Sequence, residues 1–231
     1  MPILTPTHDN GATTKPQEAL YVHPGREMTD EALATLGLPP GMNAAFVADL
    51  LSGMLTHERC GRHLYRSVAE RTNNPVLKAR YEQFGEETER HAEILEELIT
   101  ALGGRPGYVS PTARVVQGMD TKTLESTFML SGSVDIMSQE MGMLDAVFLA
   151  ESMDHANWDL LARLVDDMPD SEARSLVAAA VGQVLAEEDD HLTWARDMKA
   201  KMVKLQASSS IGATAAMKAE EMVATVRGWF S

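Results

Sequence analysis

The sequence predicts an all-α fold, a bundle of four long helices. Hydrophobic residues recur at alternating spacings of three and four, as on one face of a helix, and the longest such stripe runs from Val177 to Leu205. Aromatic residues make up only 5% of the chain while methionine occurs 15 times, a balance more usual for packed helices than for sheets. The 231 residues suffice for one domain with extensions at both ends.

The first hairpin of the bundle is expected after an N-terminal arm. Residues 1–42 contain six prolines, which predicts an extended or loosely ordered arm with at most a short helix in "MTDEALATLG". A helix is expected over 43–71, ended by "TNNP", and another over 75–102, ended by "GGRPG". The short turn between them predicts an antiparallel pair.

A second hairpin is expected after a long connection. Residues 108–132 suit a crossover from one end of the bundle to the other, with a short helix of their own. Helices are then expected over 133–164 and 172–206, separated by "DDMPDS". The predicted organisation is an arm over 1–42, a bundle over 43–206 and a C-terminal amphipathic helix over 207–231, whose apolar stripe ends at Trp229.

The charge balance restricts the partners. Lys and Arg number 20 against 34 Asp and Glu, and the net charge of -14 opposes nucleic acids and anionic membranes but attracts cations. The single Cys60 rules out an internal disulfide, and no basic segment leads into an apolar one at the start. We expect a soluble, cytoplasmic protein without nucleic-acid or membrane partners.

Ionisable residues interrupt the apolar stripes at matching places. Glu188 and His191, in "AEEDDHLTWA", lie on the stripe of the fourth helix. His91 stands 100 positions before His191, and Glu58 stands 93 positions before Glu151, so the two hairpins read as a repeat. Because these positions are nearly equidistant from the predicted turns, we expect all five side chains at one level inside the bundle.

Such a cluster requires neutralisation. An unpaired buried carboxylate costs several kcal/mol, and several at one level repel each other, so protons or cations must accompany them. Carboxylate oxygens and imidazole nitrogens suit iron or manganese. The alternative is a polar cluster ion-paired with Arg62, without a metal.

At these residues the chain resembles the ferritin-like superfamily of rubrerythrins, bacterioferritins and related di-iron or di-manganese carboxylate proteins. The family pattern, a Glu on one helix and Glu-x-x-His on the next, is used twice and is complete here in Glu151 and "EDDH". The first half departs from it, because Thr88 in "EETERH" stands where the family has a carboxylate. Glu87, four residues before His91, is the candidate substitute.

The resemblance implies a ferritin-like four-helix bundle and assigns roles. The implied metal ligands, for two Fe or Mn ions or for one, are Glu58, Glu87, His91, Glu151, Glu188 and His191. Glu188 would bridge the ions, and Thr88, His155 and Arg62 would support the ligands, although His155 is also a candidate ligand. Two divalent ions need about four negative charges, so Glu87 or hydroxide would have to join the three remaining carboxylates.

The activity implied by the resemblance is redox work with dioxygen or peroxide, as in Fe(II) oxidation or peroxide removal by a ferroxidase or peroxidase. One alternative is a non-catalytic stress or assembly module with one metal or none. Another is a di-metal oxygenase acting on an organic substrate, which needs an open pocket beside the metals. A homo-oligomer, a dimer or larger, is expected, with the C-terminal stripe as one contact.

Six further residues on or near the stripes receive no part in the site. His57 and His63 flank Glu58 off the stripe and are expected at the surface, and Glu187 is expected to be solvated. Glu140 lies on its stripe but three turns from Glu151, which is too far to share a metal. Tyr65 and Trp158 are expected to serve in core packing.

Overall fold

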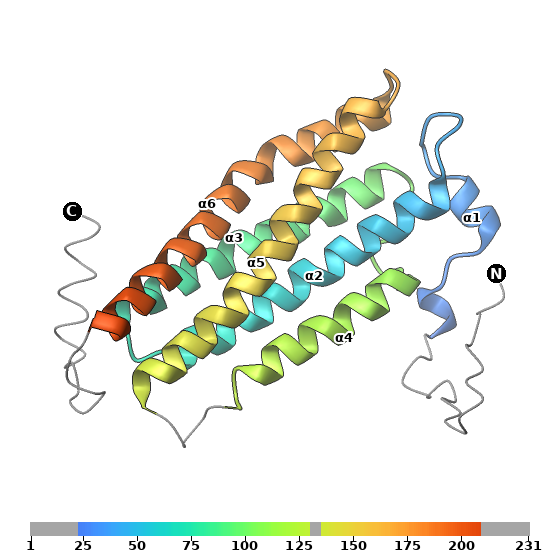
Figure 1. Cartoon of the computed structure of the whole chain (residues 1–231). Helices are drawn as coiled ribbons and strands as arrows, with labels where there is room; N and C mark the ends of the chain where they lie inside the picture. The colour runs from blue at the N-terminus through green and yellow to red at the C-terminus, as the bar shows by residue number, and fades with distance from the viewer. Residues whose placement is uncertain (1–22, 130–134, 209–231) are drawn as a thin grey trace, which may run out of the picture.

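The computed structural model describes residues 23–129 and 135–208. Every regular element in these two ranges is a helix, and four are long (Figure 1): α2 Ala44–Arg71, α3 Pro75–Ala101, α5 Ile136–Asp167 and α6 Glu172–Ser208. Helices α2 and α3 form one hairpin, and α5 and α6 form the other. The prediction of an all-α bundle is confirmed.

The helix ends follow from local capping. The Asn74 side chain accepts hydrogen bonds from Val76 and Leu77 N, and Pro75 occupies the first helical position of α3. The Asp135 side chain accepts a hydrogen bond from Ser138 N at 3.0 Å, so α5 begins at Ile136. This helix ends at Asp167, three residues past the predicted end. Beyond Ser208, where α6 ends, the expected C-terminal helix lies outside the described residues, as does the arm before residue 23.

The connection between the hairpins contains α4, Pro111–Ser126, a helix of 16 residues that is longer than expected. It runs parallel to α2, since Thr112 N donates to Asp49 Oδ1 at 3.0 Å near its start and Arg71 donates to Thr127 Oγ1 at 2.6 Å beyond its end. Gly53 permits this close packing, because a Cβ there would lie 2.8 Å from Thr112 Cγ2. The crossover thus forms a fifth helix that covers α2 and α5.

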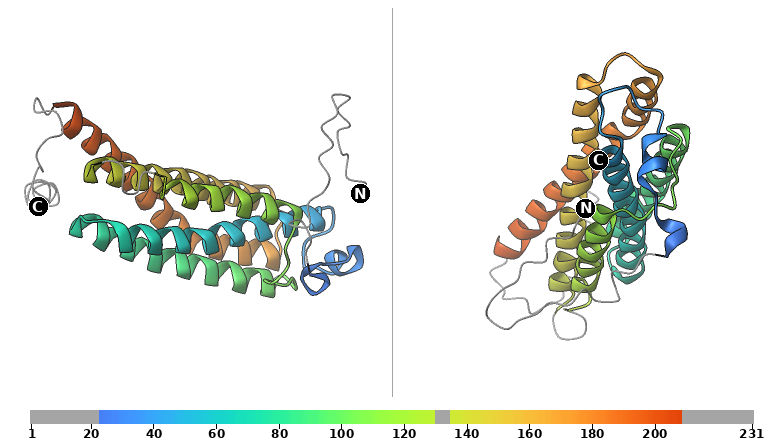
Figure 2. Two further views of the ribbon diagram at one scale, coloured as in Figure 1. Left: turned by 90° about the horizontal axis from the view of Figure 1, so that it is seen from below. Right: turned by 90° about the vertical axis from the view of Figure 1, so that its right-hand side faces the viewer.

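Residues 23–42 pack against the end of the bundle where α3 joins α4 (Figure 2). They contain the 3-10 helix η2, Pro24–Arg26, and α1, Asp30–Ala34, which confirms the short helix expected in "MTDEALATLG". Backbone hydrogen bonds of 2.9 Å from Gly37 N to Leu102 O and from Val109 N to Arg26 O attach this part of the arm.

The apolar core is divided into two clusters by a polar layer. One cluster includes Leu51, Leu95 and Leu161. The other includes Phe84 and Leu144. The buried Glu and His residues lie between them, at mid-height of the bundle, as the periodicity predicts. No helix within residues 23–129 and 135–208 has the length and apolar character needed to cross a membrane.

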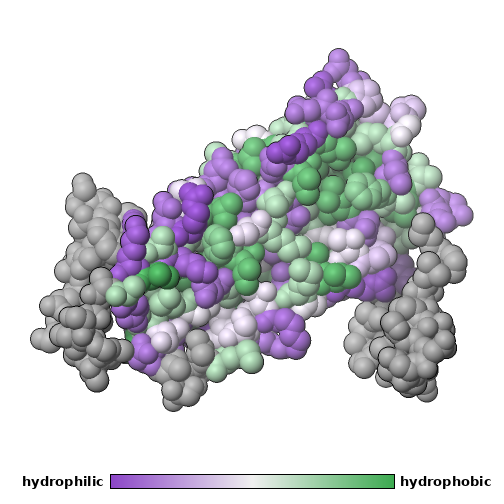
Figure 3. Space-filling model, viewed as in Figure 1, coloured by the Kyte–Doolittle hydropathy of each residue, from purple (hydrophilic) through white to green (hydrophobic). Residues whose placement is uncertain are grey.

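Part of the surface is apolar as well. Figure 3 shows hydrophobic residues gathered over the upper half of the face that carries α5. Leu149 and Leu160 of that helix are 61% and 55% exposed, and Val115 and Met119 of α4 are 62% and 53% exposed. These side chains lie on outward faces that the bundle itself leaves uncovered.

Candidate metal centre

Five ionisable side chains from four helices meet in the polar layer. Glu58, His91 and Glu188 are fully buried, and Glu151 and His191 are at most 3% exposed. They form two groups, Glu58 with His91 and Glu188, and Glu151 with Glu188 and His191. Within each group the candidate donor atoms lie within 4.8 Å of one another. Glu188 belongs to both groups, so its position is that of a bridging carboxylate.

The inward-facing atoms of this cluster are close together but not hydrogen-bonded. His91 Nδ1 lies 2.8 Å from Glu188 Oε1 and 3.9 Å from Glu58 Oε2. His191 Nδ1 lies 3.3 Å from Glu151 Oε2 and 3.6 Å from Glu188 Oε1. None of these five atoms, nor Glu188 Oε2, has a hydrogen-bond partner among the described residues. Buried polar atoms are rarely left unpaired, so this donor set fits cations at its centre.

The outer nitrogens of both histidines are held by carboxylates of the opposite hairpin. His91 Nε2 donates to Glu187 Oε2 and His191 Nε2 donates to Glu87 Oε2, both at 2.8 Å. A carboxylate accepts only, so each Nε2 carries the proton and, in the neutral ring, each Nδ1 presents a lone pair to the centre. The expectation that Glu187 is merely solvated is wrong, because the side chain is long enough to turn back to His91.

Glu87, the suggested substitute ligand, faces the outer side of His191 in this arrangement. It is in neither group of candidate donor atoms, and Gln83 Nε2 donates to its other oxygen at 3.0 Å. Its pKa is lowered, because the hydrogen bonds from Gln83 and His191 outweigh the effect of burial. The carboxylate is therefore ionised and serves as the acceptor that orients His191.

Two aromatic residues hold the outer oxygens of the terminal carboxylates. Tyr65 OH donates to Glu151 Oε1 at 2.6 Å, and Trp158 Nε1 donates to Glu58 Oε1 at 2.8 Å. Core packing alone was expected for both, and both are indeed buried. Their separation of 93 positions, the same as that of Glu58 and Glu151, is the signal that reveals their shared role.

Burial and mutual repulsion dominate the electrostatics of the centre. Burial raises the pKa of Glu58 and of Glu188 well above the ordinary value, and the charges of Asp154 and Glu151 raise both further. Burial alone would lower the pKa of His191, but the carboxylates of Glu151 and Glu87 outweigh it and raise that pKa. For His91 burial prevails and the pKa is lowered. The centre favours bound positive charge, from protons or from metal ions.

Sequence reasoning missed Asp154 of α5. Its side chain is buried, with 5% of the residue exposed, and burial raises its pKa to about 6. It lies one turn after Glu151 on the same face of the helix. That spacing is the signal in the sequence, but the corresponding position of the first hairpin is Gly61, so the repeat does not disclose it.

The three expected supporting residues contact different neighbours. Thr88 is buried, and a Cβ placed on Gly61 would lie 3.3 Å from its Cγ2. Arg62 pairs with Glu89 of α3, and His155 Nε2 lies 2.7 Å from Asp189 Oδ1. Arg62 therefore pairs with the half-exposed carboxylate of Glu89 and does not neutralise the cluster.

His57 and Glu140 are both buried, and the surface position expected for His57 is therefore wrong. His57 Nδ1 lies 2.9 Å from Asp120 Oδ2 of α4, and Nε2 lies 3.1 Å from Ala150 O. Although burial lowers the pKa of His57, the bond to Asp120 and the charge of Asp154 raise it to about 9. Glu140 accepts hydrogen bonds at 2.7 Å from Thr72 Oγ1 and Asn73 N, which closes the α2–α3 turn.

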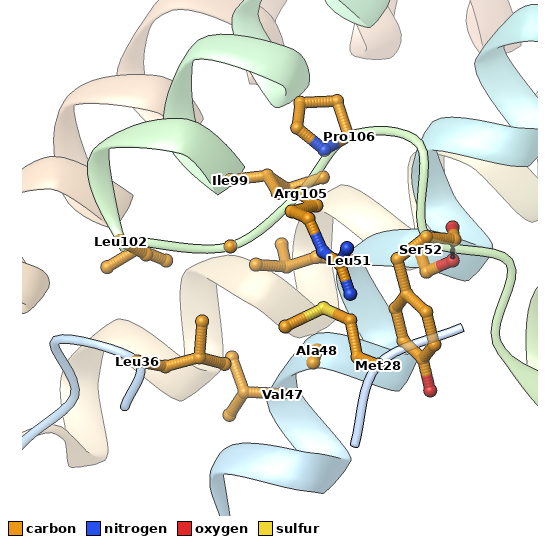
Figure 4. Close-up of a pocket in the computed structure, with 12 residues that line it drawn as sticks. Met28, Leu36, Val47, Ala48, Leu51, Ser52, Ile99, Leu102, Arg105 and Pro106 are labelled. Atoms are coloured by element: carbon orange, nitrogen blue, oxygen red, sulfur yellow. Dashed lines mark hydrogen bonds between the residues drawn. The ribbon is translucent and has the colours of Figure 1, made fainter. Parts of the chain in front are cut away.

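A pocket lies at the end of the bundle and not beside the centre (Figure 4). Its lining combines Met28 and Leu36 of the arm region with Val47 and Leu51 of α2, and includes none of the five cluster residues. Arg105, at its edge, donates to Glu27 O at 2.6 Å. The pocket therefore gives no access for an organic substrate to the candidate metal centre.

Comparison with known proteins identifies a family but no characterised relative. No curated protein and no solved structure shows a significant match to the chain. A family model described as "Domain of unknown function (DUF892)" matches residues 45–208, from the start of α2 to the end of α6. Because this match spans more than half of the 231 residues, the chain belongs to that family.

Proposed function

We propose that the centre binds two divalent iron or manganese ions and that the protein is a redox-active, ferritin-like metal protein acting on dioxygen or peroxide. The observation that carries the proposal is the division of donor atoms: the inward atoms of both groups lack hydrogen bonds, whereas the outward atoms are held by neighbours. A polar cluster without ions would hydrogen-bond its inward atoms to each other.

The residues divide into ligands and supports. Glu58 and His91 would hold one ion, Glu151 and His191 the other, and Glu188 would bridge them. Glu187 and Glu87 fix the two imidazole rings, while Trp158 and Tyr65 fix the terminal carboxylates. Bound iron or manganese would supply one-electron redox chemistry toward dioxygen or peroxide. The two core clusters keep bulk water from the centre.

Metal analysis followed by a reaction with oxygen tests the proposal. The purified chain is loaded anaerobically with Fe(II), its metal content is measured by plasma mass spectrometry, and Fe(II) oxidation is followed after oxygen is admitted. We expect two ions per chain and oxidation faster than in buffer. The Glu188→Gln variant should lose both properties, whereas Glu93→Gln, at an exposed position of α3, should keep them.

The competing functions give different results in the same assay. One ion that does not react with oxygen would favour the non-catalytic stress or assembly module, for which the missing carboxylate at Thr88 is the main support. No bound ion would favour the plain polar cluster. A di-metal oxygenase has less support, because the pocket of Figure 4 does not adjoin the centre.

Association into a dimer or a larger assembly is part of the proposal. The exposed apolar side chains on α4 and α5, among them Met119 and Leu149, support it because apolar side chains gathered on a surface often mark a contact with a partner. Light scattering of the full-length chain gives the mass directly. A monomer at all accessible concentrations would exclude association.

A further inference from the structure

Asp154 has a buried oxygen that no partner satisfies. Its Oδ1 atom is buried and lacks a hydrogen bond among the described residues, as do the inward atoms of the five cluster residues. Asp154 follows Glu151 by one turn on α5 and raises the pKa of both Glu58 and Glu188. Asp154 belongs to neither group of candidate donor atoms, but it is buried on the same face of α5 as Glu151, beside the layer that contains both groups.

Burial raises the pKa of Asp154 and the charge of the His57 ring lowers it, but no hydrogen bond joins these two side chains. Both ring nitrogens of His57 are already engaged, Nδ1 with Asp120 Oδ2 and Nε2 with Ala150 O. Two acceptors require two N–H donors, so His57 is an imidazolium whose charge is balanced by Asp120. The Oδ1 atom of Asp154 therefore remains without a hydrogen bond from His57, and a cation held by the cluster would satisfy it.

The charge count gives Asp154 a role. Glu58, Glu151 and Glu188 supply three negative charges, one fewer than two divalent ions require. In the first hairpin the positions of the missing acids are filled by Thr88 and Gly61, which pack against each other. In the second hairpin the corresponding positions are Glu188 and Asp154. Asp154 therefore restores the count of four carboxylates for two ions.

We propose that Asp154 supplies the fourth carboxylate of the centre and takes the part that an acid at position 88 would have. The inference rests on the proposed function, because it assigns a ligand to the same pair of ions. It also removes the need for Glu87 or hydroxide as the fourth charge, which leaves Glu87 free to orient His191.

The test is an anaerobic titration of the full-length chain with Mn(II) alone, followed by calorimetry and native mass spectrometry. We expect the unmodified chain to bind two ions and Asp154→Asn to bind the second ion at least tenfold more weakly. Asp166→Asn, at an exposed position of the same helix, should bind as the unmodified chain does. Thr88→Glu in the Asp154→Asn background should restore the second ion.

Three results separate the inference from its rivals. Two ions bound with unchanged affinity by Asp154→Asn would overturn it. A lowered melting temperature in that variant would then show that Asp154 stabilises the fold as a charge partner of His57. No ion bound by the unmodified chain would overturn the proposed function itself. Circular dichroism verifies folding, and Asp154→Ser, which also lacks the charge, replaces the Asn variant if that variant does not fold.

Discussion

The two hairpins are built alike but carry unequal sets of acids. In α2–α3 the inward positions are Glu58, Gly61, Thr88 and His91, and in α5–α6 they are Glu151, Asp154, Glu188 and His191. The first hairpin thus provides one buried carboxylate to the layer, and the second provides three. The comparison teaches that the charge of such a centre is set by the whole layer, so one hairpin can lose acids that the other supplies.

The supporting contacts, by contrast, are equal in the two halves. Glu187 holds His91 as Glu87 holds His191, and Trp158 holds Glu58 as Tyr65 holds Glu151. In each pair the two supporting residues are repeat equivalents. The hairpins therefore differ in the atoms that would touch ions and agree in the atoms that orient them.

The largest expected effect comes from removing the ligands of one hairpin at a time. Glu188→Ala with His191→Ala should abolish metal retention, because Glu188 belongs to both groups. Glu58→Ala with His91→Ala should leave one ion. Both apo proteins should remain helical by circular dichroism, since the apolar clusters are untouched. Unchanged metal content in the first double variant would rule out the site.

The next effect concerns His57, which has Ala150 as its repeat equivalent. Its pKa is raised to about 9 from an ordinary value of 6.5, so its contribution to stability is fully present below pH 6.5 and is lost as the pH rises through 9. His57→Gln should lower the free energy of unfolding by about 3 kcal/mol at pH 6 and by much less at pH 10.

Urea denaturation of the metal-free protein at the two pH values measures this difference. His63→Gln, at an exposed position of the same helix, is the control and should change stability by less than about 0.5 kcal/mol. An equal loss at both pH values for His57→Gln would show that the ring serves packing and not an ion pair with Asp120.

A smaller effect tests the crossed contacts to the histidines. In the Glu58→Ala, His91→Ala background, which should retain the ion at Glu151, Glu87→Ala is expected to weaken that ion about tenfold. Glu187→Ala should leave its affinity unchanged, because its partner His91 is already absent. Glu86→Ala, at an exposed neighbouring position, is the control in the same Mn(II) titration. Equal weakening by the two variants would contradict the crossed arrangement.

The smallest expected effect is on the melting temperature, when Glu188 is replaced by an uncharged residue, as Thr88 is in the first hairpin. Since the pKa of Glu188 is raised, its ionised form destabilises the metal-free fold increasingly as the pH rises above the ordinary value. Glu188→Gln should therefore raise the melting temperature of the metal-free protein by roughly 5 °C at pH 8 and by less at pH 5. A scan at both pH values measures it, and a lower melting temperature at pH 8 would contradict the prediction.

The sequence predicted the helices and the inward residues because both depend on periodicity. His91 and His191 lie on continuous apolar stripes, and the repeat places them at one level. The length of α4 was underestimated because its exposed face includes Val115 and Met119, which obscures an amphipathic pattern. The burial of His57 has the same origin, since α4 covers a face of α2 that a four-helix bundle leaves open.

Side-chain direction was less accessible to sequence reasoning. Glu87 and Glu187 lie beside the stripes, and only the spacing between helices decides whether such a long side chain turns inward or to solvent. Asp154 lies on the stripe, but a search guided by the repeat passes over it because its equivalent is Gly61. The ligand types are thus readable from the chain, whereas the contacts that orient them depend on packing.

Because the hydrogen bonds to the histidines are crossed, neither hairpin alone can orient its own histidine ring. Separated from α6, His91 would lose the acceptor that fixes its proton on Nε2, and His191 would lose its own without α3. The tautomer that presents a lone pair to an ion is therefore a property of the joined halves. Two copies of either hairpin, related by a twofold axis, could form the same pair of crossed hydrogen bonds. The contacts that orient the histidines therefore have the symmetry of a homodimer, although both hairpins belong to one chain.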